Sequence, residues 1–144
     1  MIAIRPMTFD DYDAVLALMR GAPGVAVRAA DSPAAIQRYL TRNPGLSFVA
    51  ESDDRLIGCI FGGHDGRRGS LLHLAVAADF QRQGVGRRLV ERALAGLAAE
   101  GILKSHIDVF ADNRGAIAFW QRLGWVKRDD ICRFSFNNSS DPNV

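Results

Sequence analysis

Residues 81–88 read Gln-Arg-Gln-Gly-Val-Gly-Arg-Arg, and the segments on either side of this stretch decide the fold. Before it, Leu71–Ala77 is a short apolar run of strand length. After it, Leu89, Val90, Ala93, Leu94 and Leu97 recur at helical spacing among charged residues. The chain is therefore predicted to pass from a strand through a basic, glycine-containing turn into a helix.

Such a turn suits an anionic ligand. The first N–H groups of a helix have no partner within it, and the helix dipole is positive at that end. Gly84 and Gly86 lack a Cβ, so a phosphate can approach the backbone, and Arg82, Arg87 and Arg88 add charge. Neither the lysine of a P-loop nor the third glycine of a dinucleotide fingerprint follows. The turn is predicted to hold a phosphate of a ligand other than ATP or NAD.

The rest of the chain predicts an α/β (α+β) fold, with one mixed central sheet and helices on both faces. Thr8 and Asp11 form a capping-box pattern that opens one helix, and Ser32-Pro33 opens another. The expected strands are Ile2–Arg5, Leu46–Glu51, Leu56–Gly62, Leu71–Ala77, Ser105–Phe110, Trp125–Lys127 and Ile131–Phe136, about seven in all. The expected later helices are Gly86–Glu100 and Asn113–Leu123. Residues 1–136 are expected to form one domain, followed by a polar, disordered tail at 137–144.

Two motifs together resemble the GNAT superfamily of N-acetyltransferases. The first is Gln81-x-x-Gly84-x-Gly86 after the strand ending Leu74-Ala75-Val76, which looks like the acetyl-CoA pyrophosphate motif. The second is residues 113–125, NRGAIAFWQRLGW, which is similar to the family's Asn-x-x-Ala segment. The pattern is nearest to the ribosomal-protein alanine acetyltransferase-like group, and the resemblance covers Ile2–Phe136.

The resemblance implies a splayed wedge between the fourth and fifth strands that takes the pantetheine arm of acetyl-CoA. The implied cofactor-binding residues are Leu74, Ala75, Val76, Arg82, Gln83, Gly84, Val85, Gly86, Arg87, Arg88 and Asn113. A backbone N–H near Val76 would meet the oxyanion. By its position before the helix, Asn113 is also a good N-cap.

Acyl transfer to an amine requires a base when the amine is protonated near neutral pH. Asp108 is the first candidate, because it occupies the position at which the alanine acetyltransferase group carries a glutamate base. Strand alternation would place His106 on the same face, although Asp108 can equally cap the turn before Asn113. His73 and His106, each on a strand bordering the wedge, are further candidates, although a strand histidine is more often structural.

Trp120 departs from the family pattern, in which many members have a tyrosine acid. Indole is far too weak an acid for that role. Trp120 is therefore expected either to wall the thioester pocket or to pack in the core, and core packing is the favoured interpretation. A non-catalytic CoA-binding sensor or partner-binding module is therefore the alternative function.

Composition sets the remaining expectations. The net charge of +2 and few aromatic residues argue against a nucleic-acid partner. Cys59 and Cys132 lie in predicted strands without metal spacing and are expected to be core residues in a reducing compartment. The sequence has no signal-peptide pattern and no run of membrane-spanning length, so a cytoplasmic monomer or homodimer without a metal or membrane partner is expected. The resemblance to N-acetyltransferases implies that the acceptor is an amine of a protein or small molecule.

Overall fold

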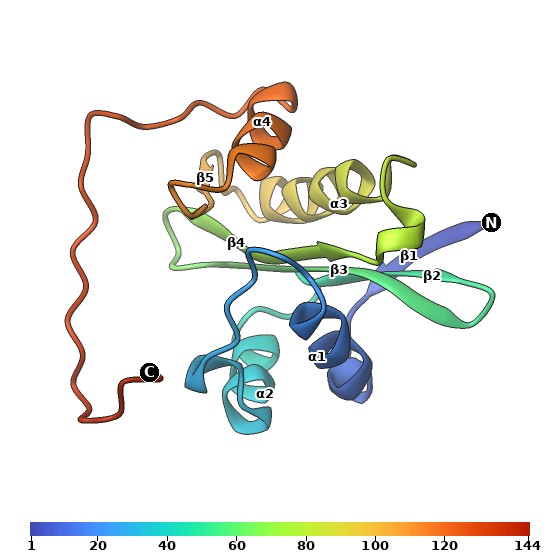
Figure 1. Cartoon of the computed structure of the whole chain (residues 1–144), viewed down its shortest axis with the longest axis horizontal. Helices are drawn as coiled ribbons and strands as arrows, with labels where there is room; N and C mark the ends of the chain where they lie inside the picture. Colours follow the sequence, from blue (N-terminus) through green and yellow to red (C-terminus); the bar gives the residue numbers. More distant parts are fainter. The chain divides into compact units, whose positions relative to one another are not determined.

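The computed structural model describes residues 1–144 and contains one five-stranded sheet in the order β1-β2-β3-β4-β5 (Figure 1). The strands are β1 (Ile2–Pro6), β2 (Phe48–Ser52), β3 (Arg55–His64), β4 (Gly69–Val76) and β5 (Ser105–His106). The helices are α1 (Tyr12–Arg20), α2 (Pro33–Arg42), α3 (Val85–Ala99) and α4 (Arg114–Arg122). No helix is both long and apolar enough to cross a membrane.

The chain divides into two compact units, Met1–Asp108 and Val109–Val144. In the first unit, which contains the whole sheet, β1 to β4 pair antiparallel and β5 joins β4 in parallel after the α3 crossover. Helices α1 and α2 cover one face of this sheet and α3 covers the other (Figure 1). The predicted fold class is confirmed.

The apolar residues of α3 form a stripe that packs on the sheet. Val85, Leu89, Val90, Ala93 and Leu97 are all buried. Gly58 of β3 lies beneath this helix, and a Cβ there would stand 3.1 Å from Leu89 Cδ1 and 3.2 Å from Val85 Cγ1. The missing side chain thus lets the start of α3 lie close to the sheet. This packing fixes the position of the start of α3, and with it the end of the turn at residues 81–84, relative to the sheet.

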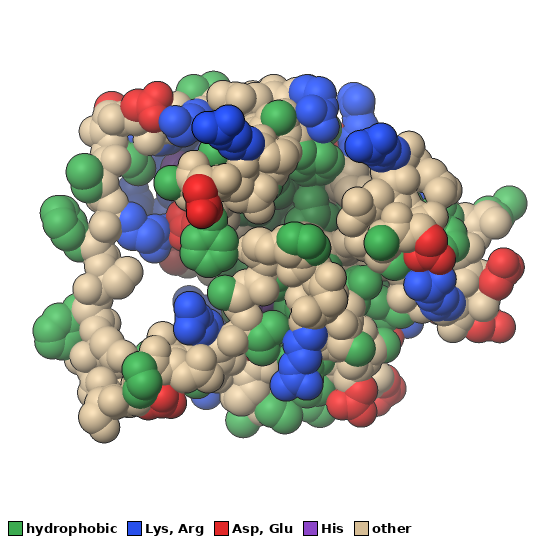
Figure 2. All heavy atoms as spheres, in the orientation of Figure 1, with side chains coloured by type: hydrophobic (Ala, Val, Ile, Leu, Met, Phe, Trp, Pro, Cys, Tyr) green, Lys and Arg blue, Asp and Glu red, His purple; other side chains and the backbone are tan.

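The strand count of about seven is wrong, because the structure has five. A strand needs backbone partners, and 125–127 and 131–136 of the second unit form no ladder. Their apolar side chains are exposed instead: Val126 81%, Ile131 58%, Phe134 93% and Phe136 86%. In Figure 2, hydrophobic side chains stand out along this extended segment. The expected strand Ser105–Phe110 is likewise shortened to β5, whose pairing with β4 stops at Ser70–His106.

Arg5 ties β1 to the start of α1. Its guanidinium donates to both carboxylate oxygens of Asp11 at 2.7 and 2.8 Å, and it also contacts the carboxylate of Glu51. The Thr8 N–H donates to Asp11 at 2.9 Å, which places the predicted helix start at this position. The hydrogen bonds from Arg5, with that from Thr8, hold the pKa of Asp11 below its usual value against the opposing effect of burial.

We expect Asp11→Asn to lower the free energy of unfolding at pH 7 by about 1–2 kcal/mol, because Arg5 loses a charged hydrogen-bond acceptor. The loss is limited to this size because Arg5 is half-exposed and solvent screens its charge. The unfolded carboxyl has a pKa of about 3.9, so the ionised Asp11 stabilises the fold fully above that pH. As the pH falls below it, towards the lower pKa of the folded state, this contribution disappears. Urea unfolding of both proteins from pH 7 to pH 3 should show the difference shrinking; a constant difference would contradict the assignment.

The two cysteines have different environments. Cys59 in β3 is fully buried, as expected, and burial raises the pKa of its thiol to about 12, despite a hydrogen bond from the Ala75 backbone that opposes the rise. Cys132 is exposed in the second unit, so its assignment to the core is wrong, for the same reason that residues 131–136 form no strand.

We expect iodoacetamide at about pH 8 to alkylate Cys132 and spare Cys59, because only an accessible thiolate reacts. Mass spectrometry of the digested protein, with and without denaturant, measures both sites. Equal labelling of the two cysteines in the folded protein would show that β3 is not buried in solution.

Candidate active site

The turn before α3 has the predicted geometry. Gly84 is the N-cap of α3 with φ +78°, in the left-handed region, and a Cβ built there would meet nothing within 4 Å. The first backbone hydrogen bond at this end is from the Arg88 N–H to the Gly84 carbonyl at 3.1 Å. The N–H groups of Val85, Gly86 and Arg87 therefore have no backbone acceptor. Three donors beside open space form a site for an anion.

The arginines of the turn differ in their contacts. Arg87 pairs with Glu91 at 2.9 Å, and Arg88 donates two hydrogen bonds of 3.2 Å to the Ile2 carbonyl. Arg82 is exposed, has φ +61° and forms no hydrogen bond in the structure. Of the three arginines, Arg82 is thus the one whose guanidinium is not already engaged.

The turn is fastened to the sheet by side chains. Gln81 Nε2 donates to the Val76 carbonyl at 3.2 Å, and Gln83 Nε2 donates to the Asp79 carbonyl at 3.3 Å. Asp79 itself accepts two hydrogen bonds from Arg55 of β3, at 2.7 and 3.1 Å. The end of β4 and the start of α3 are therefore held together, with predicted site residues Leu74, Ala75 and Val76 forming the end of the strand.

Strand β4 extends beyond its pairing with β5. They pair only at Gly69–Ser105 and Ser70–His106, whereas β4 continues to Val76. Along the opposite edge β4 pairs with β3, and its register shifts between Cys59 and Phe61. His73 and Leu74 occupy this irregularity, which has the form of a β-bulge.

His73 lies in the bulge with an unusual backbone. Its φ of +48° is left-handed, a conformation that costs a residue with a side chain of order 1–3 kcal/mol. Its Nε2 is 2.8 Å from Oδ1 of Asp31, whose side chain is 6% exposed. Burial would raise the pKa of Asp31, but the hydrogen bonds from His73 and from the Arg28 N–H outweigh it and hold that pKa below its ordinary value.

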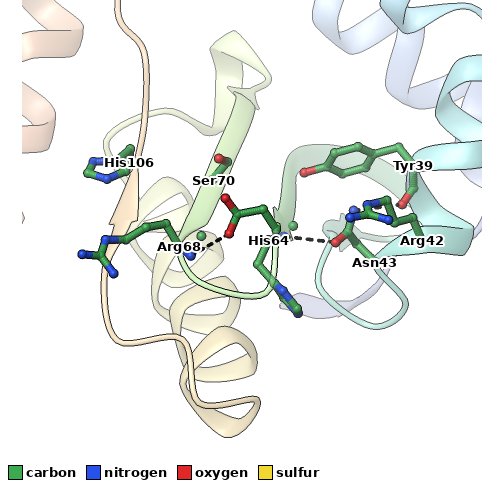
Figure 3. A pocket seen from close by; sticks show the side chains of 10 residues that line it. Tyr39, Arg42, Asn43, His64, Arg68, Ser70 and His106 are labelled. Atoms are coloured by element: carbon green, nitrogen blue, oxygen red, sulfur yellow. Dashed lines mark hydrogen bonds between the residues drawn. The ribbon is translucent and has the colours of Figure 1, made fainter.

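The other two base candidates are exposed. His106 ends β5, and Asp108 lies two residues beyond it, outside the strand. His106 lines a hollow of about 480 Å³ together with Ser70, Arg68, Arg42, Tyr39 and Asn43, among others (Figure 3). In the hollow, the His64 N–H donates to Asn43 Oδ1 at 3.0 Å, and the Arg68 N–H donates to Asp65 at 2.8 Å. No three His, Cys, Asp or Glu side chains cluster as potential metal ligands.

In the second unit, Asn113 caps α4 as predicted. Its Oδ1 accepts from the Ala116 N–H at 3.1 Å. Trp120 is 6% exposed and packs edge-on against Trp125 at 4.8 Å between ring centroids. Trp120 is thus a packed residue of the second unit.

Sequence reasoning missed Asp31. It lies in a short turn, Ala29–Asp31, and is separated from His73 by 42 residues, so no local pattern connects the two. The only local signal was the spacing of Arg28 and Asp31, whose N–H and carboxylate bond at 2.9 Å.

Comparison with known proteins gives consistent matches. The family model described as acetyltransferase (GNAT) family matches residues 12–125. An acetyltransferase of Pectobacterium atrosepticum is 34% identical over 129 residues, which are 89% of this chain and 90% of the relative.

Two solved structures have the same fold. The PaiA N-acetyltransferase from Thermoplasma acidophilum, in complex with coenzyme A, aligns with TM-score 0.74 and 18% identity, covering 85% of this chain and 88% of that one. The ribosomal-protein alanine N-acetyltransferase from Escherichia coli aligns with TM-score 0.68 and 23% identity, covering 86% and 77%.

Proposed function

The chain belongs to the acetyltransferase (GNAT) family, and we infer that it holds acetyl-CoA with the turn before α3 and the end of β4. It is an N-acetyltransferase with acetyl-CoA as donor and an amine as acceptor. The main support for this binding site is the geometry at Gly84. Its φ is left-handed, the space above it is open, and the first N–H groups of α3 beside it have no backbone acceptor.

In this proposal the pyrophosphate lies on the N–H groups of Val85, Gly86 and Arg87, with the Arg82 guanidinium closing over it. Gln83 and Arg88 border the same turn. The pantetheine arm runs along Leu74–Val76, where β4 has no partner in β5. The solved structure with coenzyme A supports this choice of ligand.

We also propose that both units form one acetyltransferase domain, in which Asn113 contacts the cofactor through the amide nitrogen that its capping role leaves available. The family match, which spans residues from both units, supports this proposal.

The reaction is direct transfer. The amine nitrogen attacks the thioester carbonyl, the C–S bond breaks, and sulfur leaves as a thiolate. A thiol pKa of about 8.5 makes that leaving group acceptable near neutral pH, so the absence of a tyrosine at Trp120 is tolerable. We propose a backbone N–H near Val76 as the oxyanion donor.

A base is needed more for a lysine-type amine, with a pKa of about 10.4, than for an α-amine at about 7.7–8.0. Asp108, His73 and His106 are the proposed candidates. Asp108 and His106 are exposed, whereas His73 is partly buried and has a carboxylate partner.

Incubation with labelled acetyl-CoA and four amines tests direct transfer. The amines are an alanine-initiated peptide, a lysine peptide with a blocked N-terminus, spermidine and kanamycin. We expect each CoA thiol released to be matched by one acetylated amine. A stable acetyl-enzyme formed without any amine would contradict direct transfer.

We propose the cytoplasm as the site of action, because acetyl-CoA is an intracellular metabolite and both cysteines are free thiols. A monomer or homodimer without nucleic-acid, membrane or metal partners remains our proposal for the assembly.

A further inference from the structure

We propose that His73 is the general base of the transfer and that Asp31 is its positioning residue. The inference rests on the proposed function, since it takes the acceptor to be an amine. It gives a part in the reaction to Asp31, a buried carboxylate that lies outside the two motifs described above.

The pair is built from two elements that the fold brings together. Asp31 is nearly fully buried, its Oδ2 accepts from the Arg28 N–H at 2.9 Å, and its carbonyl accepts from the Tyr12 hydroxyl at 2.6 Å. The His73 ring lies edge-on to Phe61, with 6.0 Å between ring centroids. Both partners are therefore fixed by contacts other than their own hydrogen bond.

The contact fixes which ring nitrogen is basic. An ionised carboxylate only accepts hydrogen bonds, so Nε2 of His73 must carry the proton that reaches Asp31. In the neutral ring, Nδ1 then holds the lone pair. No hydrogen bond occupies Nδ1 in the structure, and the side chain is 22% exposed, so this nitrogen is available to a ligand.

The backbone brings His73 next to the part of β4 that is proposed to bind the pantetheine arm. His73 immediately precedes Leu74, the first of the strand residues proposed to lie along the pantetheine arm, and both residues lie in the bulge of β4. A left-handed histidine is a strained conformation that its surroundings must maintain, and such strain concentrates at functional sites.

Protons and electrons balance in the resulting step. Nδ1 of His73 accepts a proton from the amine as its nitrogen bonds to the acetyl carbon. The electron pair of the broken C–S bond leaves with sulfur, and the proton passes from the imidazolium to the thiolate or to solvent. Asp31 remains ionised throughout and stabilises the transient imidazolium.

Three variants test the pair. Asp31→Asn keeps the shape and the bond from Arg28, but its amide can donate to Nε2 and favour the other tautomer. His73→Gln removes the base. Glu100→Gln is the matched control, because Glu100 accepts from His64 at 2.9 Å in a second histidine–carboxylate pair on the surface.

Two measurements decide the outcome. The first is nitrogen NMR of the His73 ring in free protein, which does not depend on turnover. The proton is expected on Nε2 in the wild type, with a shift towards Nδ1 in Asp31→Asn. A wild-type ring protonated on Nδ1 overturns the proposal.

The second is steady-state kinetics with the most active amine of the panel. We expect kcat to fall about 100-fold in His73→Gln and about 10-fold or more in Asp31→Asn. Acetyl-CoA affinity by calorimetry should stay within about twofold of wild type, and Glu100→Gln should be unaffected. Full kcat in His73→Gln, or a loss found only in Asp108→Asn, would overturn it. If the folded wild-type protein did not bind acetyl-CoA, that result would instead refute the proposed function.

Discussion

Gly84→Glu should weaken acetyl-CoA binding by about 100-fold or more, which corresponds to about 2.7 kcal/mol. Gly84 has φ +78° and open space above it, so a side chain there would occupy the volume proposed for the pyrophosphate. Two like charges about 4 Å apart near a protein surface repel by about 4 kcal/mol, and the flexible glutamate can relieve only part of this. Calorimetry with acetyl-CoA measures the loss.

A glycine just beyond the other end of α3 provides the control variant. Gly101 follows α3 at its other end, with φ +83° and nothing within 4 Å of an added Cβ. Gly101→Glu introduces the same charge and the same backbone strain, of about 1–2 kcal/mol in stability. It should leave acetyl-CoA affinity unchanged. Equal affinity losses in the two variants would mean that Gly84 acts through stability and not as part of the site.

Gly62→Ala is expected to lower the free energy of unfolding by about 3 kcal/mol. A Cβ at Gly62 would stand 2.3 Å from the backbone carbonyl oxygen of Leu46, and a backbone atom cannot move aside cheaply. The Gly62 N–H also donates to the Ser47 hydroxyl at 3.1 Å, so β3 cannot shift without losing that bond. Urea unfolding monitored by circular dichroism measures the effect.

Gly66 lies four residues further along, and its surroundings are different: its φ is +93°, and an added Cβ would meet nothing within 4 Å. Gly66→Ala should therefore cost only the backbone strain, about 1 kcal/mol. If both alanine variants were equally stable, the close approach of Leu46 to β3 would be disproved.

Local signals explain what the sequence predicted well. The glycine-containing turn before α3, the Asn113 cap and the Asp11 contact to Thr8 each depend on residues a few positions apart. The apolar spacing of α3 also predicted its buried face. Such features are set by backbone geometry and hydrogen bonding within one turn, which a single sequence records directly.

Long-range pairing explains what could not be predicted. Residues 131–136 have the alternation of a strand, but alternation does not supply a partner, and Phe134 and Phe136 are exposed. The contact between Asp31 and His73 depends on the β4 bulge and on the loop before α2 meeting across one face of the sheet. Neither residue type nor spacing indicates that contact.

The most direct test of the central claim is a titration of nitrogen-labelled wild-type protein with acetyl-CoA, observed through its backbone amides by NMR. We predict saturable shifts concentrated at Val85, Gly86 and Arg87 and along Leu74–Val76. A folded protein whose amides do not respond, or respond only away from these two segments, would contradict the account.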